Sequence, residues 1–203
     1  MLASAALSLA QEHHASVSTL ISSHQYASAA ALLRPLLEAT IVAGWSIYCA
    51  KPDHVVEILF GRKPLPEIRS MMVRLDRTPE LRGLLELHKI EKVISVLHDL
   101  THGGMQQLGR RFTQNMHEAT FDTAEVAIFL SLSDWIWCFA LTFSLIVEPS
   151  PVLPERHRNR TADLVLEIAL YIPAVAADWP GWQPFPEPEI ERGVIPSSLD
   201  DRD

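Results

Sequence analysis

The sequence is poor in lysine and lacks the short motifs that most directly indicate an activity. Only four of the 17 basic residues are lysines, so the cationic groups are mostly arginines, whose forked guanidinium suits phosphate and carboxylate. A formal net charge of −8 excludes broad non-specific binding of nucleic acid, which requires clustered cations. There is no P-loop, no dinucleotide-binding glycine fingerprint and no Gly-x-Ser-x-Gly turn. Any function must therefore be sought in small polar clusters.

The chain has only two cysteines, and one of its apolar runs is long enough to suggest a membrane span. Cys49 and Cys138 lie in apolar surroundings without a Cys-x-x-Cys partner, which predicts two buried free thiols in a reducing cytoplasm. Residues 126–147 are apolar over about the ~20 residues that a membrane span needs. However, Asp134 lies in the middle of this run and no basic flank anchors it. We therefore predict a central buried helix of a soluble protein and no membrane contact.

Hydrophobic periodicity is helical along most of the chain. Apolar residues recur at three- and four-residue spacing, and we find neither an alternating strand pattern nor an internal repeat. The predicted helices cover residues 2–24, 27–50, 53–60, 66–76, 80–89 and 162–172, and a long helix is predicted to begin at Asp122 or Thr123 and to end near residue 148. The helix at 80–89 either ends there or continues towards Leu100. Asp53 is expected to cap the third of them and Gly61 to close it. The pattern predicts an all-α fold, an antiparallel helical bundle with a Pro-rich irregular C-terminal tail.

Changes in composition divide the chain into three parts. Residues 1–148 are expected to form the helical bundle, which is long enough to bury a substantial core. Residues 149–177 combine a Pro-rich linker with a final helix that packs on the bundle. Residues 178–203 are an irregular acidic tail, whose Trp179 and Trp182 we expect to fold back, because exposed aromatic rings are unfavourable.

A polar pair interrupts the apolar helix at 27–50. Arg34 and Glu38 are four residues apart and share one helical face. Pro35 has no amide hydrogen, which frees the carbonyl of Ala31 for another donor. The pair is either an ion pair at a solvent edge, adding a few tenths of a kcal/mol, or part of a polar pocket between helices that faces His102.

The segment after residue 92 places two histidines one helical turn apart. Leu97 and Leu100 fall on an apolar face, whereas His98 and His102 lie on another. Two imidazoles at this spacing can begin a metal site, with either Glu38 or Asp99 as a third ligand. The Glu of the zincin pattern does not follow His98, so we favour ordinary hydrogen-bonded histidines and expect no metal and no cofactor.

A second cluster follows at Arg110, Arg111 and His117. A guanidinium can stabilise the extra negative charge of a phosphorane, and an imidazole can move the proton of an attacking hydroxyl. Arg111 and His117 converge only if the helix breaks between them. The alternative is a solvated helix end, whose arginines complement the helix dipole.

Two patterns in this chain occur together, Leu33-Arg34-Pro35-x-x-Glu38-Ala39 and Asp99-x-Thr101-His102-x-Gly104. In combination they resemble an uncharacterised group of bacterial helical proteins related to HEPN domains, over roughly residues 10–148. The resemblance implies a helical bundle, often dimeric, from toxin–antitoxin or phage-defence systems. Many HEPN proteins are metal-independent ribonucleases with an Arg-x(4–6)-His motif completed across a dimer. Arg111-x(5)-His117 and Arg110-x(6)-His117 match that spacing, although Phe112 replaces the polar residue that usually follows the arginine.

These observations give one leading expectation and one rival. The leading expectation is a HEPN-like homodimer that could cleave RNA in such a system. Its candidate catalytic residues are Arg34, Glu38, His102, Arg110, Arg111 and His117. The rival is a non-catalytic interaction module, antitoxin-like or a scaffold, which binds a cognate protein partner through its acidic surface and aromatic tail. A ferritin-like metal bundle is weaker, because the paired Glu-x-x-His motifs of that class are missing.

Overall fold

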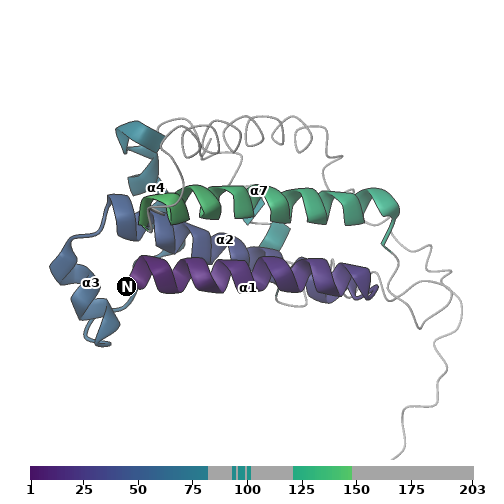
Figure 1. Cartoon of the computed structure of the whole chain (residues 1–203), viewed down its shortest axis with the longest axis horizontal. Helices are drawn as coiled ribbons and strands as arrows, with labels where there is room; N and C mark the ends of the chain where they lie inside the picture. The colour runs from purple at the N-terminus through teal and green to yellow at the C-terminus, as the bar shows by residue number, and fades with distance from the viewer. Residues whose placement is uncertain (82–92, 95, 99, 102–120, 148–203) are drawn as a thin grey trace, which may run out of the picture.

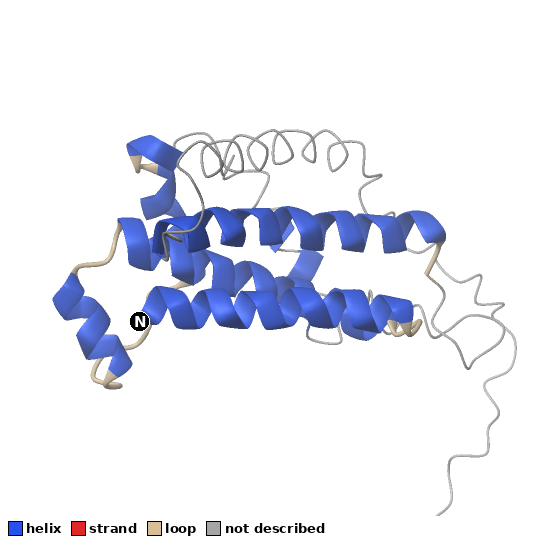
Figure 2. Cartoon of the chain, viewed as in Figure 1, coloured by secondary structure: helices blue, strands red, loops and turns tan. Residues whose placement is uncertain are grey.

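The computed structural model describes residues 1–81, 93–94, 96–98, 100–101 and 121–147 of the chain. Every regular element in these residues is helical, which confirms the all-α prediction (Figure 2). The elements are α1 (Leu2–Ser22), α2 (Tyr26–Tyr48), α3 (Pro52–Leu59), α4 (Ile68–Asp76), the 3₁₀ turn η1 (Pro79–Leu81) and α7 (Thr123–Val147). The described residues between 93 and 101 are also helical. The helices expected at 80–89 and 162–172 and the Pro-rich tail lie wholly or almost wholly outside the described residues.

Three long helices, α1, α2 and α7, form the body of the bundle (Figure 1). A loop of three residues joins α1 to α2, so these helices run antiparallel, as expected for such a short connection. The helix α7 packs against both of them and runs antiparallel to α1. The shorter α4 packs against α2. The helices α2 and α7 therefore run in the same direction, each antiparallel to α1, and the described helices form a bundle as predicted.

Local chemistry fixes where two of the helices begin or end. At the start of α7, Asp122 Oδ1 accepts from the Glu125 amide at 2.7 Å, and Glu125 Oε2 accepts from the Asp122 amide at 3.1 Å. This reciprocal pair is a capping box. After α3, Gly61 adopts a left-handed φ of 68°, as predicted for a residue that closes a helix.

The expected cap at Asp53 is wrong. Lys51 occupies the N-cap position without a side-chain hydrogen bond, and Pro52 begins α3. Proline is tolerated there because the first helical amide needs no intrahelical acceptor. Asp53 instead lies in the first turn, where its charge complements the helix dipole.

The helix α2 forms the centre of the core. Its fully buried residues include Ala29, Leu33, Leu36, Ala43 and Trp45, all with no exposed surface. Close approach to α7 is possible at Gly44, because a methyl group placed there would lie 2.8 Å from two ring carbons of Phe143. This tight contact holds α2 in place, and α2 carries the polar pair described below.

Two helices, Tyr26–Tyr48 and Thr123–Ser144, are long and apolar enough to cross a membrane by length and composition alone. The same features are typical of core helices in soluble proteins. Both helices pack against other helices of the bundle. A soluble cytoplasmic protein without membrane-spanning segments thus remains a prediction.

Candidate functional site

The strongest polar cluster of the described residues is centred on Arg34 of α2. The Arg34 Nε donates a hydrogen bond to Glu38 Oε1 at 2.7 Å. Its Nη1 contacts the Nδ1 of His98, which is 64 residues away in the sequence. The Arg34 side chain is 22% exposed and that of Glu38 is 35% exposed. The predicted ion pair is therefore present, and it also reaches a second helical segment.

The contact with Arg34 requires one particular tautomer of the His98 imidazole. A guanidinium can only donate, so Nδ1 must be the acceptor in this contact. An imidazole that accepts at Nδ1 carries its proton at Nε2. Arg34 thereby occupies the lone pair that His98 would need to act as a base through Nδ1.

A further interhelical bond involves the carbonyl freed by Pro35. The single hydroxyl proton of Thr101 is shared between the Leu97 carbonyl at 2.7 Å and the Ala31 carbonyl at 3.4 Å. The sequence predicted another donor for the Ala31 carbonyl and considered Arg34 for this role. Thr101 fills it instead, which leaves the Arg34 guanidinium for Glu38 and His98.

The same segment combines core and site contacts. Leu97 and Leu100 are fully buried, whereas His98 is exposed. For these three residues, the division agrees with the predicted apolar and histidine-bearing faces, whereas His102 lies outside the described residues. Leu97, Leu100 and Thr101 thus anchor the segment to the bundle and hold the His98 imidazole beside Arg34.

The cluster faces an open hollow of about 500 Å³. Its lining residues are Arg34, Glu38, Ile68, Arg69, Met72, Ile94 and His98, from α2, α4 and the 93–101 segment. Among the described residues, two guanidinium groups line it with one carboxylate and one imidazole, and the other lining side chains are apolar. This volume lies within the range of small-molecule sites. The combination suits a ligand with both an anionic and an apolar part.

The other predicted catalytic residues are His102, Arg110, Arg111 and His117, and they lie outside the described residues. Whether they converge on Arg34 therefore stays a prediction. Among the described residues, no group of three His, Cys, Asp or Glu side chains could hold a metal ion.

Sequence reasoning missed a second polar cluster, centred on His14. The His14 Nδ1 lies 3.0 Å from the hydroxyl of the fully buried Ser133, and its Nε2 lies 3.8 Å from Asp134 Oδ1. Its ring stacks on Trp137 at 5.3 Å between centroids. The missed signal is its spacing, four residues after the buried Ala10 and three before Val17.

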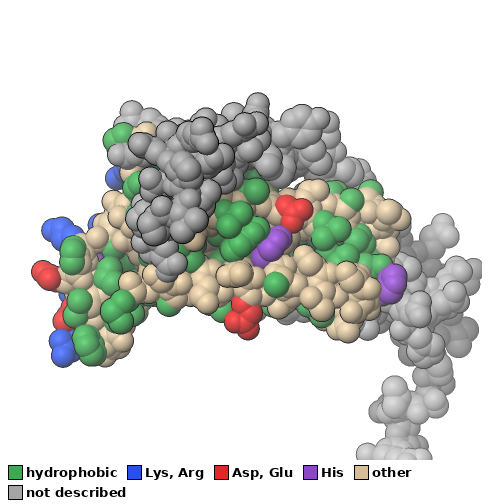
Figure 3. Space-filling model, in the orientation of Figure 1, with side chains coloured by type: hydrophobic (Ala, Val, Ile, Leu, Met, Phe, Trp, Pro, Cys, Tyr) green, Lys and Arg blue, Asp and Glu red, His purple; other side chains and the backbone are tan. Residues whose placement is uncertain are grey.

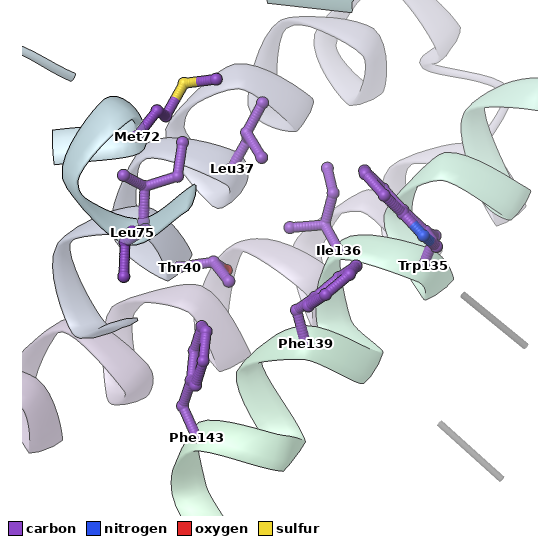
Figure 4. A pocket seen from close by; sticks show the side chains of 9 residues that line it. Leu37, Thr40, Met72, Leu75, Trp135, Ile136, Phe139 and Phe143 are labelled. Carbon is purple, nitrogen blue, oxygen red and sulfur yellow. The ribbon is translucent and has the colours of Figure 1, made fainter. Parts of the chain in front are cut away.

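A small, partly open apolar pocket lies between α2, α4 and α7 (Figure 4). Its volume is about 20 Å³, which is enough for a single water molecule. The aromatic rings of Trp135, Phe139 and Phe143 surround it, and the hydroxyl of Thr40 is already bonded to the Leu36 carbonyl. It is a packing defect of the core and has no room for a substrate.

The two cysteines are free thiols, as predicted, but both are only partly buried. Burial, together with the negative charge of Asp134, raises the pKa of the Cys138 thiol above its ordinary value of 9.0. A thiol with a raised pKa is a poor nucleophile near neutral pH. Cys138 is therefore not a candidate catalytic residue.

Comparison with known proteins places the chain in a family. Residues 7–163 match the family described as "Family of unknown function (DUF6988)". No curated protein and no solved structure matches the chain. The family description carries no activity and nothing in it refers to HEPN domains. Since the match covers more than three quarters of the sequence, the chain belongs to this family of unknown function, DUF6988.

Proposed function

We propose that this chain is a HEPN-like protein of a bacterial toxin–antitoxin or phage-defence system, and that it cleaves RNA without a metal ion. The observation that carries the proposal is the contact between the Arg34 guanidinium and the His98 imidazole in an open hollow. An arginine and a histidine in contact are the two groups that metal-independent phosphodiester cleavage needs most.

The Arg34 guanidinium is oriented to bind an anion. Glu38 accepts from Nε at 2.7 Å and thereby orients the guanidinium, while Nη1 reaches toward His98 at the hollow. A phosphate entering the hollow would meet Arg34 and Arg69 together. Forked contacts of this kind are strongest with phosphate and carboxylate groups.

Binding of the phosphate would also activate His98. When Arg34 turns to the phosphate, the Nδ1 lone pair of His98 is released and can accept the proton of the ribose 2′-hydroxyl. The 2′-oxygen then attacks phosphorus, the bond to the 5′-oxygen breaks, and His98 returns the proton to that oxygen. The products are a 2′,3′-cyclic phosphate and a 5′-hydroxyl, and the protein ends in its starting protonation state. Arg34 stabilises the phosphorane formed between these steps.

The downstream residues Arg110, Arg111 and His117 have the spacing of the HEPN motif. In this proposal they extend the Arg34 site from the same protomer or from a second copy in a homodimer. If their spacing is a coincidence, Arg34, Glu38 and His98 form the whole site.

The rival function is a non-catalytic interaction module that binds a cognate protein. The net charge of −8 favours it, because a strongly acidic surface attracts basic partners and repels RNA. In that case, the Arg34 cluster would serve only to hold the 93–101 segment on α2.

The two functions are separated by RNA cleavage assays in excess EDTA. Wild-type protein is expected to produce 2′,3′-cyclic ends, and His98→Ala to lose roughly 10²- to 10⁴-fold in rate, the usual range for a general acid–base group. Arg34→Ala is expected to lose about 10²-fold or more. His102→Ala and His117→Ala show whether the downstream histidines contribute.

Matched controls come from the same helices as the site or from α1. Arg74 is an exposed arginine of α4 outside the hollow, and His13 of α1 lies outside it as well. Arg74→Ala and His13→Ala should retain wild-type rates. Absence of cleavage by the wild type, or equal rates for His98→Ala and the wild type, would overturn the proposed mechanism.

A further inference from the structure

The end of the molecule at α3 exposes a group of large apolar side chains. Phe60 is 70% exposed, while Val56, Leu59 and Leu65 are each 45% exposed. Val56, Leu59 and Phe60 are three and four residues apart, so they share one helical face. In Figure 1, α3 lies at one end of the bundle, beside the start of α1. We call these four side chains the α3 surface.

The opposite side of α3 is anchored, so the α3 surface is held outward. The His54 ring meets the fully buried Trp45 edge-on, with 5.7 Å between ring centroids. Ile58 packs against the core. A rotation of α3 that turned its exposed apolar side chains inward would break the contacts of His54 and Ile58 with the core.

Basic side chains flank the α3 surface. Lys51, Arg62 and Lys63 are all exposed, and the Arg62 guanidinium lies over the Phe60 ring at 5.4 Å. Figure 3 shows hydrophobic, basic and acidic side chains together at this end of the molecule, and Arg62 is paired with Glu57 at 3.2 Å. Between residues 51 and 65, three lysine or arginine side chains outnumber two carboxylates, although the whole chain carries −8. This local reversal of sign favours an anionic partner.

We propose that the α3 surface docks on an anionic lipid bilayer, with Phe60, Leu59 and Val56 inserted at the headgroup level. Aromatic and leucine side chains on one face of a helix, with lysine and arginine beside them, are typical of helices that lie in the interface plane. The cations add attraction to a negatively charged leaflet. This contact is peripheral and independent of the proposed RNA cleavage. It departs from our prediction that the chain makes no membrane contact.

The size of the surface favours a bilayer over a second copy of the chain. Four partly exposed side chains present on the order of a few hundred Å² of apolar area, below the roughly 800 Å² per partner of a standard protein interface. The α3 surface also projects from the end of the bundle, whereas a docking groove for a peptide would be concave. A bilayer accepts a few protruding side chains without a complementary shape.

The test is co-sedimentation of the full chain with vesicles. We expect binding to phosphatidylcholine vesicles that contain about 30% phosphatidylserine, weaker binding at high salt, and little binding to pure phosphatidylcholine. The double variant Leu59→Asp with Phe60→Asp should lower the partition coefficient by about tenfold or more. The variant Lys51→Glu with Lys63→Glu should lower it too, by about fivefold or more for each lysine replaced.

Leu9 of α1 provides the matched control, because it is 46% exposed, close to the value for Leu59. Leu9→Asp should bind these vesicles as the wild type does, and circular dichroism should show unchanged helicity for every variant. The proposal is overturned if wild-type protein stays in the supernatant with anionic vesicles, or if the α3 double variant binds them as well as Leu9→Asp. A fall in molecular mass of the α3 double variant in light scattering would also overturn it, because the surface would then join two copies.

Discussion

Gly44→Ala directly perturbs the contact that holds α2 against α7. The new methyl carbon would lie 2.8 Å from both Cε2 and Cζ of Phe143 and 3.5 Å from Cδ2. Carbon atoms in ordinary contact are about 3.5–4.0 Å apart, so the ring or one helix must move. Phe143 is only 3% exposed, and the adjoining pocket of about 20 Å³ is too small to take its ring. Overpacking of this kind costs about 1–3 kcal/mol.

An opposing term comes from the helix itself. Alanine is favoured over glycine inside a helix by about 0.8–1.0 kcal/mol. The difference predicts that Gly44→Ala lowers the free energy of unfolding by about 1 kcal/mol. Urea unfolding followed by circular dichroism measures it. In a Phe143→Leu background the clash is gone, so the same change at Gly44 should become stabilising. A gain of stability in the wild-type background would refute the packing argument.

Two further predictions concern α7. Burial and the Asp134 charge both raise the pKa of the Cys138 thiol. In a Cys49→Ala background, half-maximal alkylation of Cys138 by iodoacetamide is therefore expected above pH 9.0. Asp134→Asn should move this midpoint to lower pH, because it removes one of the two causes. As the pH rises, the thiol of the unfolded chain loses its proton before the thiol of the folded chain does. The contribution of Cys138 to stability is therefore intact below pH 9.0 and is lost as the pH rises above it. An alkylation midpoint below pH 9.0 would contradict this prediction. His14→Ala should lower the free energy of unfolding by about 1–3 kcal/mol, because it removes the hydrogen-bond partner of the buried Ser133 hydroxyl. In a Ser133→Ala background the same substitution should cost less, and equal losses in the two backgrounds would contradict coupling between the two side chains.

Helix positions were readable from sequence because they depend on local periodicity. The expected helix at 27–50 corresponds to α2 at Tyr26–Tyr48, and of the two expected starts of α7, Asp122 and Thr123, the helix begins at Thr123. The cap of α3 was misread, because Pro52 and Asp53 can both begin a helix and sequence alone does not rank them. Local sequence rules therefore predict the presence of a helix more reliably than they predict its first residue.

The candidate site was only partly readable. The pair Arg34 and Glu38 was evident from four-residue spacing, which is a local property. The meeting of Arg34 with His98 joins residues 64 positions apart, and no periodicity specifies which of two histidines faces the arginine. His14 was overlooked for a similar reason, because its main partner Ser133 belongs to a helix 119 residues away. Sequence spacing identifies the residues that share one helical face, whereas tertiary packing determines which other residues that face contacts.

The central claim is that Arg34 and His98 act as one unit on a phosphodiester. The most direct measurement is a double-mutant cycle on the rate of RNA cleavage in EDTA, using Arg34→Ala, His98→Ala and the combined variant. Residues that act together in one step give strongly non-additive losses. We expect the combined variant to be no slower than the slower single variant. Losses that multiply, or wild-type rates in either single variant, would contradict the account.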